Sequence, residues 1–402
     1  MSSQAQLPEA PQDTLVRLRA RQAAHPIWDS RLLQACRAGH LTKADFYYLF
    51  GQYDHYSRNF TRCLAGLMAN CESDLFRARL SENLWEEGGG AAPETRHAAI
   101  FRRFLVDALE IEPETIVYAD STRYFVQSYL SHCLQADGAA GAAFLSLGTE
   151  GIIARLYGDF VAGLTQAGIP EADLTFFRLH MASDDAHAET IEQLMVSYAD
   201  APGWSETCML AMNRALDLRH GFFDALYETL QHRRVAQVFD RIHARQSLAA
   251  DLPADAPLSH RLSEHGQPMY QNTNERLNIQ FSVERVPFAA EVIDPRIVRI
   301  PAGKYNENHR HAHETVFYIV QGTGQVIIDD RTIPVQAGDI AFVPRWATHQ
   351  SQNTGAGEMV ILALTDFGLT GRAAIGDAFH TPRHQATEPS PPEPVQGEPP
   401  SR

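Results

Sequence analysis

The sequence predicts a multidomain α plus β protein, in which an all-helical part precedes a small β-barrel. A length of 402 residues exceeds what one hydrophobic core normally organises, which favours two domains. From about residue 12 to 245, apolar residues recur at three- and four-residue spacing, the pattern of amphipathic helices. Beyond Pro295 come short β-rich runs separated by Gly, Pro, Asn and Asp, which are typical of a small barrel or sandwich.

The expected boundaries follow from changes in composition along the chain. We expect the helical domain over residues 12–245. Residues 246–275 are polar and lack periodicity, so we expect a linker there. The β-barrel is expected over 276–370, built from the runs IVRI, TVFYIV, GQVIID, DIAFV and MVILAL. Residues 380–402 are too rich in proline and polar groups to bury a core, so we expect a disordered tail.

Charge and hydropathy exclude several kinds of partner. The net charge of −15 argues against nucleic acid, because phosphate binding needs a basic face. No apolar run approaches the roughly 20 residues that cross a bilayer, so no membrane partner is expected. The N-terminus MSSQAQLPEAPQD lacks the features of a secretory signal, and the five cysteines include no CxxC pair. We expect a cytoplasmic protein that acts on a small molecule.

The segment HMASDDAH is the most informative part of the helical half. On a helix, residues at i, i+4 and i+7 fall within roughly 60° of one another, so His180, Asp184 and His187 share one face. Two imidazoles and a carboxylate suit iron or manganese better than a structural zinc ion. A solvated polar face or a capping cluster is the alternative interpretation.

A two-metal site needs further carboxylates from opposite helices. Glu150 lies in FLSLGTEGIIARLYG, which we expect to be an apolar helix antiparallel to that of His180. A carboxylate there is costly unless it is paired or bound to metal. In NLWEEGGGAAPETRH, Glu87 near a helix end is followed ten residues later by His97.

These residues carry a resemblance to the haem-oxygenase-like di-iron oxidases and oxygenases. The matching set, in the family's order, is Glu87, His97, Glu150, His180, Asp184 and His187. Over about 200 residues the resemblance implies a helical fold that binds two irons, uses O₂ as co-substrate and takes electrons from an external donor. Some N-oxygenating members add a glutamate from the first core helix. That helix contains no glutamate here, and Asp54 or His55 are the candidate substitutes.

Two other groups of this fold are weaker alternatives. The thiaminase-like group uses a cysteine nucleophile, for which Cys133 is available, but it has no use for an HxxxDxxH face. A haem-binding oxygenase needs one proximal histidine and no carboxylate array.

Two motifs mark the β half, GKYNENHRHAHETVFYIVQG at 303–322 and GDIAFVPRWATHQSQN at 338–353. On a strand, an HxH pair points both imidazoles to one face, where a third histidine from another strand can complete a triad. We therefore expect His309, His311 and His349 to bind a metal.

The two motifs closely resemble those of the cupins. Thr315 stands where that family has its metal-binding glutamate, and Trp346 where it has a glycine. His313 and Glu314 are weaker candidate ligands; Glu314 would face away unless a bulge intervenes. Three neutral ligands suit Fe(II), although zinc, copper or nickel would also bind. Some cupins instead serve as metal-free binding or dimerisation modules, and we expect a homodimer.

The pairing of these two domains resembles that of the bacterial N-nitrosating enzymes of streptozotocin biosynthesis. The resemblance implies that the di-iron domain N-oxygenates an amine or guanidine of an amino-acid-derived metabolite. The cupin metal would then carry out a further oxidation or rearrangement that forms an N–N bond or an N-nitroso group. The alternative is a di-iron oxidase that desaturates or cleaves a carbon chain, with the cupin as a binding or dimerisation module. Fold alone does not fix the substrate.

Overall fold

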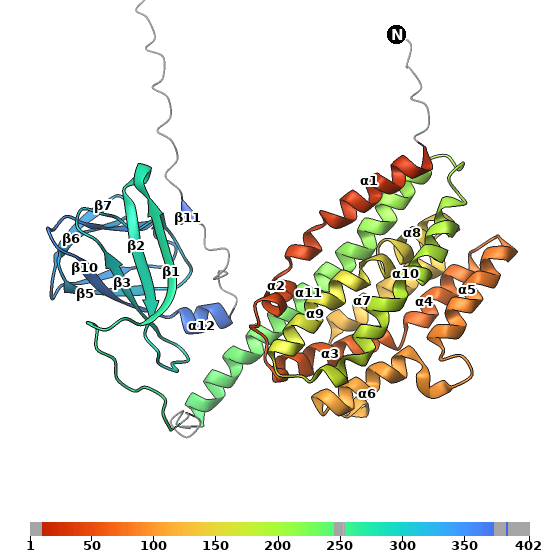
Figure 1. Ribbon diagram of the computed structural model, residues 1–402, viewed down its shortest axis with the longest axis horizontal. Helices are drawn as coiled ribbons and strands as arrows, with labels where there is room; N and C mark the ends of the chain where they lie inside the picture. The colour runs from red at the N-terminus through yellow and green to blue at the C-terminus, as the bar shows by residue number, and fades with distance from the viewer. Residues whose placement is uncertain (1–9, 245–251, 253, 374–382, 385–402) are drawn as a thin grey trace, which may run out of the picture. The chain divides into compact units, whose positions relative to one another are not determined.

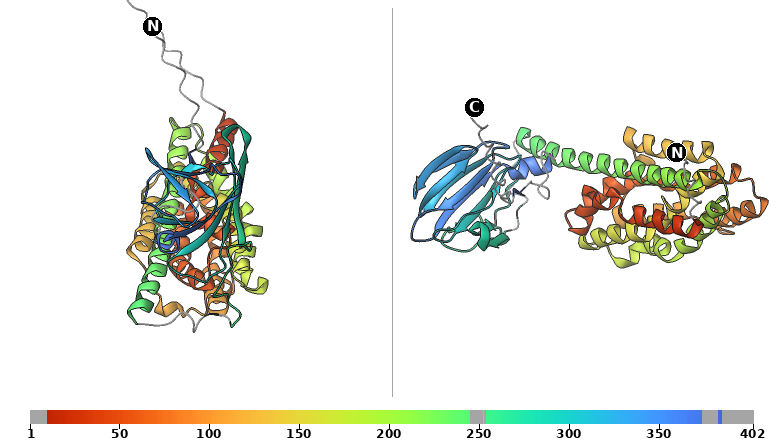
Figure 2. Two further views of the ribbon diagram at one scale, coloured as in Figure 1. Left: turned by 90° about the vertical axis from the view of Figure 1, so that its left-hand side faces the viewer. Right: turned by 90° about the horizontal axis from the view of Figure 1, so that it is seen from above.

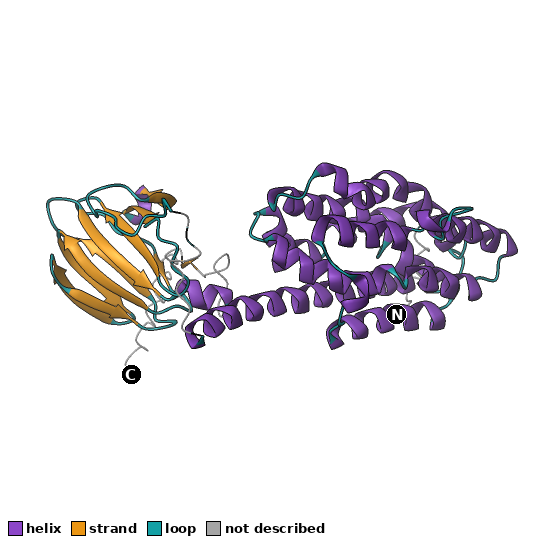
Figure 3. Cartoon of the chain, turned by 90° about the horizontal axis from the view of Figure 1, so that it is seen from below, coloured by secondary structure: helices purple, strands orange, loops and turns teal. Residues whose placement is uncertain are grey.

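The computed structural model describes residues 10–244, 252, 254–373 and 383–384; for residues 183–186 and 383–384 only the backbone is described. The chain divides into two compact units, Met1–Leu230 and Gln231–Arg402. Helices make up the first unit, and strands with the short helix α12 (Phe367–Arg372) dominate the second (Figure 3). The expected multidomain α plus β class, with the helical part first, is confirmed.

Eleven α-helices precede the strands within the described residues, labelled in Figure 1; the last of them, α11, continues past Leu230 into the second unit. They are α1 (Pro11–Ala23), α2 (Arg31–Arg37), α3 (Lys43–Ser57), α4 (Phe60–Ala69), α5 (Asp74–Glu87), α6 (His97–Leu109), α7 (Asp120–Gln135), α8 (Gly138–Ser146), α9 (Ile153–Gln166), α10 (Thr175–Val196) and α11 (Trp204–His243). In the part of the chain that is described, every helix is too short or too polar to span a membrane.

An aromatic core fixes the helices that carry the candidate ligands. Phe50 of α3 lies at its centre and is fully buried. Its ring centroid is 5.4 Å from those of Phe104 on α6, Phe160 on α9 and Phe177 on α10. Buried edge-to-face pairs of this kind each contribute about 0.5–1.5 kcal/mol beyond their buried area. The four helices are therefore held rigidly beside the site.

A glycine turn places Glu87 opposite His97. Helix α5 ends at Glu87, and the chain reverses through Gly89 and Gly90, whose φ angles of 83° and 59° favour glycine. A Cβ at Gly89 would lie 2.5 Å from the backbone nitrogen of Arg96, so this turn has no room for a side chain. The turn returns the chain to α6, which begins at His97.

Glu150 does not lie in a continuous apolar helix, which corrects the sequence-based expectation. The helix breaks between α8 and α9, where Thr149 adopts φ −132° and ψ −75° and Glu150 begins a short 3₁₀ turn, Glu150–Ile152. The break brings α11 close, because a Cβ on Gly148 would lie 2.5 Å from the Cβ of Ala215. Glu150 is buried in this turn.

The second unit consists of two antiparallel sheets around one core, seen in two further views in Figure 2. The six-stranded sheet has the order β1-β2-β3-β10-β5-β8 and the five-stranded sheet the order β11-β4-β9-β6-β7. The strands are β1 (Gln267–Asn274), β2 (Ile279–Arg285), β3 (Asp294–Ile300), β4 (Asn308–His309), β5 (Thr315–Gln321), β6 (Thr323–Ile328), β7 (Arg331–Gln336), β8 (Ile340–Val343), β9 (His349–Asn353), β10 (Met359–Thr365) and β11 (Arg383–His384).

The β half differs from the sequence-based expectation in two places, and a third expectation falls largely outside the described residues. Strand β1 falls inside the expected linker 246–275, because its sequence QPMYQNTN is too polar to show apolar alternation, yet it pairs antiparallel with β2. Strand β4 ends at His309, so His311 lies in the following turn and not on a strand with it. The expected tail 380–402 lies outside the described residues except for β11.

Candidate metal centres

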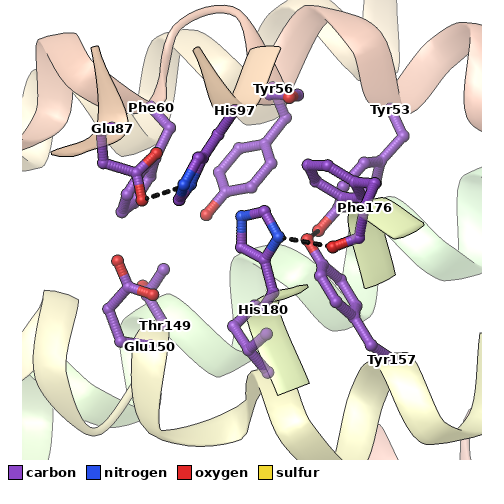
Figure 4. Close-up of a pocket in the computed structure, with 12 residues that line it drawn as sticks. Tyr53, Tyr56, Phe60, Glu87, His97, Thr149, Glu150, Tyr157, Phe176 and His180 are labelled. Carbon is purple, nitrogen blue, oxygen red and sulfur yellow. Dashed lines mark hydrogen bonds and ion pairs between the residues drawn. The ribbon is translucent and has the colours of Figure 1, made fainter. Parts of the chain in front are cut away.

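Three candidate ligands converge in the helical unit. Donor atoms of Glu87, His97 and His180 all lie within 4.8 Å of one another, an arrangement that can hold a metal ion. They come from the end of α5, the start of α6 and the second turn of α10. Figure 4 shows these side chains pointing toward one another, with Glu150 facing them.

His97 and Glu87 form a close contact at the cluster, at a separation that two ligands of one metal would also have. His97 Nδ1 lies 2.9 Å from Glu87 Oε1, yet this nitrogen has no hydrogen-bond partner among the described residues. Two donors that each bind one metal at about 2.1 Å, at right angles, are about 3.0 Å apart. The pair is therefore preorganised for a shared ion, and the donor set of carboxylate and imidazole fits iron.

His180 is oriented by its own helix. Its Nδ1 lies 2.7 Å from the carbonyl oxygen of Phe176, so this nitrogen carries the proton and Nε2 keeps its lone pair for the site. Burial, together with the neighbouring His97, lowers the pKa of His180 to about 4. At neutral pH the imidazole is neutral and can bind a metal.

A small cavity of about 30 Å³ joins this cluster to Glu150. Such a volume suits ions or one or two waters rather than an organic substrate. Its wall also includes Tyr53, Tyr56 and Tyr157. Asp184 lies on α10, but its side chain is outside the described residues.

His187 lies at the edge of the cluster, and its partner was missed by sequence reasoning. Its Nε2 lies 2.7 Å from Glu86 Oε2, while its Nδ1 is buried and lies 3.7 Å from Glu87 Oε1. An imidazole that donates one N–H to a carboxylate has its other nitrogen fixed toward a metal. The signal available in the sequence was the adjacent pair Glu86–Glu87 before the glycine turn.

The structure does not bring Asp54 or His55 into this cluster. Asp54 is fully buried and accepts a hydrogen bond from the Tyr118 hydroxyl at 2.6 Å, while His55 stacks on the Tyr118 ring. Helix α3 instead directs Tyr53 and Tyr56 toward the site, and both hydroxyls accept hydrogen bonds from Arg219, at 3.1 and 2.8 Å. Burial raises the pKa of Tyr56 well above its usual value, so its hydroxyl stays protonated.

Three histidines form the candidate centre of the β unit. Donor atoms of His309, His311 and His349 lie within 4.8 Å of one another. His309 on β4 and His349 on β9 are direct cross-strand partners, and their rings lie 4.3 Å apart. The register of these two strands thus brings the first and third histidines together, and the turn after β4 adds His311.

Each cupin-motif histidine is oriented by a nearby backbone carbonyl. The Nδ1 atoms of His309, His311 and His349 lie 3.0, 2.9 and 3.0 Å from the carbonyl oxygens of Glu307, His313 and Ala347. All three can therefore present Nε2 toward a common centre. Burial lowers the pKa of His311 to about 2 and that of His349 well below its usual range, which keeps these imidazoles neutral.

The weaker candidates of the β unit lie beside the triad or away from it. His313 stacks on His311 at 3.5 Å, and burial lowers its pKa to about 3. Glu314 is exposed and its Oε2 lies 3.6 Å from Arg345 Nη2, so it faces away as expected. Thr315 is buried on β5. Trp346 adopts φ 63°, which explains why the cupin motif has glycine at this position.

The cysteines do not support the nucleophile alternative. All five are free and buried. A hydrogen bond with Cys63 and burial raise the pKa of Cys133 well above its usual value. A thiol held protonated in this way is a poor nucleophile.

Comparison with known proteins agrees with this division. Residues 47–220 match the family model of iron-containing redox enzymes, which is haem-oxygenase-like, and residues 296–365 match the model of the cupin domain. The 1-hydroxy-2-naphthoate 1,2-dioxygenase of a Nocardioides strain is 29% identical over 84 residues, 19% of this chain and 22% of that protein. The oxalate-binding protein of Thermotoga maritima is 29% identical over 68 residues, 17% of this chain and 56% of that protein.

Two solved structures resemble part of the chain. A predicted oxalate decarboxylase from Thermotoga maritima is 20% identical with a TM-score of 0.23, covering 27% of this chain and 98% of that one. A salicylate 1,2-dioxygenase from Pseudaminobacter salicylatoxidans is 19% identical with a TM-score of 0.22, covering 23% of this chain and 28% of that one. The chain spans less than two thirds of the length of either curated relative. The two domain matches and the dioxygenase relative support a non-haem iron oxidoreductase.

Proposed function

We propose that this protein is an O₂-dependent non-haem di-iron oxygenase that N-oxygenates an amine or guanidine of a small amino-acid-derived metabolite. His309, His311 and His349 would hold a second metal, which would supply a further oxidation or rearrangement of the product. The observation that carries the proposal is the convergence of Glu87, His97 and His180 within 4.8 Å, beside Glu150 in one buried cavity. Mixed carboxylate and imidazole ligands are what helical di-iron proteins use.

The position of Glu87 supports two metal positions. Its Oε1 lies 2.9 Å from His97 Nδ1 and 3.7 Å from His187 Nδ1, so one carboxylate oxygen faces histidines from two different helices. Glu87, His97, Glu150, His180 and His187, together with Asp184 as expected from the sequence, would hold the two irons.

Iron held by these residues would supply the activation of O₂. The chain contributes orientation, exclusion of water and protons. Phe60, Ile153 and Phe176 form an apolar part of the cavity wall, which keeps bulk water out. A guanidinium group can only donate hydrogen bonds, so the Tyr56 hydroxyl oxygen accepts one from Arg219. The hydroxyl proton of Tyr56 therefore stays available to the cavity. An external electron donor is part of the proposal, as is a homodimer.

The decisive experiment combines product analysis with ligand variants. Iron-loaded, reduced protein is incubated with O₂ and a panel of amino acids and guanidines, and products are read by mass spectrometry for added oxygen. We expect His180→Ala to abolish the first oxidation and His349→Ala to let a hydroxylated intermediate accumulate. Product formation by His180→Ala after loss of its iron would refute the proposal for the helical site. Unaltered final product from His349→Ala would refute the second step.

Counting metals separates the alternatives. About three irons per chain is expected for two active centres, whereas about two would indicate a cupin without metal. The alternative expected from the sequence is a di-iron oxidase that desaturates or cleaves a carbon chain. A desaturated or cleaved product from fatty acids in the same assay, with no oxygen added to nitrogen, would favour that candidate.

A further inference from the structure

A second, larger cavity lies against the candidate di-iron site. Its volume is about 650 Å³, within the range of small-molecule sites. It shares Ser57 and Glu87 with the small cavity that contains the candidate ligands. A molecule bound in the larger cavity therefore lies beside Glu87, a carboxylate of the candidate metal cluster. The 30 Å³ cavity alone is too small to hold such a molecule.

Four arginines line this cavity: Arg58, Arg96, Arg102 and Arg103. The carboxylates in its wall are Glu87, Asp107 and Glu114. Glu87 already faces His97 at 2.9 Å, and Glu114 is 78% exposed, so its contact with Arg102 is weakened by solvent. The wall thus carries four guanidinium groups against three carboxylates, one of which, Glu87, belongs to the candidate metal cluster.

Asp54 holds two of these arginines in place. Its fully buried carboxylate lies 3.4 Å from Arg102 Nε and 3.9 Å from Arg58 Nη1. One carboxylate beneath two guanidinium groups leaves about one positive charge in excess. A single excess charge matches a carboxylate better than a dianionic phosphate, and the planar guanidinium suits carboxylate recognition.

We propose that this cavity is the substrate site of the helical domain, where Arg58 and Arg102 bind a carboxylate of the substrate and the reacting nitrogen lies at the Glu87 end. The placement of the nitrogen rests on the proposed function, whereas the recognition of the carboxylate does not. Asp54, expected from the sequence as a possible ligand, is then a residue that positions the arginines.

The test uses binding without turnover. The full, iron-loaded chain is titrated calorimetrically without oxygen, with amino acids each paired with its decarboxylated amine: arginine with agmatine, lysine with cadaverine, phenylalanine with phenethylamine. We expect at least one amino acid to bind at least about tenfold more tightly than its amine, the effect of one charge-assisted contact. Arg102→Gln and Arg58→Gln should each remove most of this preference and leave binding of the amine unchanged.

Controls keep the result interpretable. Arg123→Gln alters an arginine outside the cavity, on α7, and should leave the preference intact. Arg58 lies farther from Asp54 than Arg102 does, so Arg58→Gln tests the idea even if Arg102→Gln fails to fold. The inference is overturned if no amino acid outbinds its amine, if both variants keep the preference, or if inorganic phosphate binds where carboxylates do not. Carboxylate binding without oxygenation would instead refute only the proposed function.

Discussion

Glu86 offers a direct test of the helical site, because its carboxylate contacts a candidate ligand without itself belonging to the cluster. Glu86→Ala removes the acceptor that lies 2.7 Å from His187 Nε2. Loss of such a partner costs a metal site roughly 10- to 100-fold in affinity, since the imidazole loses both orientation and basicity. The Glu86 side chain is 64% exposed, so water replaces part of the contact. We therefore expect about a tenfold loss, or about 1.4 kcal/mol.

The measurement is an anaerobic Fe(II) titration in competition with a chromogenic chelator. It is made in the His349→Ala background, so that iron in the β unit contributes little to the signal. Glu86→Gln retains an oxygen acceptor and should lose less affinity than Glu86→Ala. Glu82→Ala, an exposed change one turn earlier on α5, is the control for loss of charge. The reasoning is refuted if Glu86→Ala binds iron as tightly as its parent, or if Glu82→Ala weakens binding equally.

Three further predictions concern stability. Gly148→Ala would place a Cβ 2.5 Å from the Cβ of Ala215 and should lower the free energy of unfolding by about 1–3 kcal/mol. Gly158→Ala, whose Cβ would meet nothing within 4 Å, should raise the free energy of unfolding by about 0.4–1 kcal/mol. Melting temperatures of the two variants that shift in the same direction would contradict this. Burial lowers the pKa of His132 from 6.5 to about 4, so between these values the unfolded chain binds more protons and stability falls as pH falls. Allowing for partial exposure of the ring, the loss at pH 5 is about 1 kcal/mol, and it should be absent from His132→Gln in urea denaturation at pH 7 and 5. Trp346→Gly should relieve about 1 kcal/mol of left-handed strain and raise the melting temperature without changing metal content; a lower melting temperature would count against the strain.

The spacing of residues led us to expect Glu87, His97 and His180 in one cluster, but not the residues around them. Glu87 and His97 flank a glycine turn, and the structure places them with His180 as the motif implies. Glu86 is an exposed residue with no periodic signal, and only the packing of α5 against α10 brings it to His187. The contacts of the Asp54 side chain could not be predicted either, because its carboxylate faces Tyr118 and Arg102, which are distant in sequence.

The remaining differences lie where the chain turns. The run around Glu150 is apolar on both sides, so periodicity alone could not show that the helix breaks at Thr149. In the β half, short β-rich runs located β3, β5, β6, β8 and β10, but not β1, whose polar sequence pairs through its backbone. Backbone pairing leaves no trace in hydropathy.

The two candidate metal centres differ in how far apart in the chain their orienting contacts lie. Each of His309, His311 and His349 lies against a carbonyl two residues away, so its tautomer is set by the local backbone. In the helical unit, His187 depends on Glu86, 101 residues earlier, and His97 faces a carboxylate across the glycine turn. Replacing one of these three histidines by alanine should leave the other two side chains in their orientation. Free imidazole added in solution should then supply the missing third ligand. The helical cluster assembles only when α5, α6 and α10 have packed together, so any iron bound there would report on the folded state of this unit.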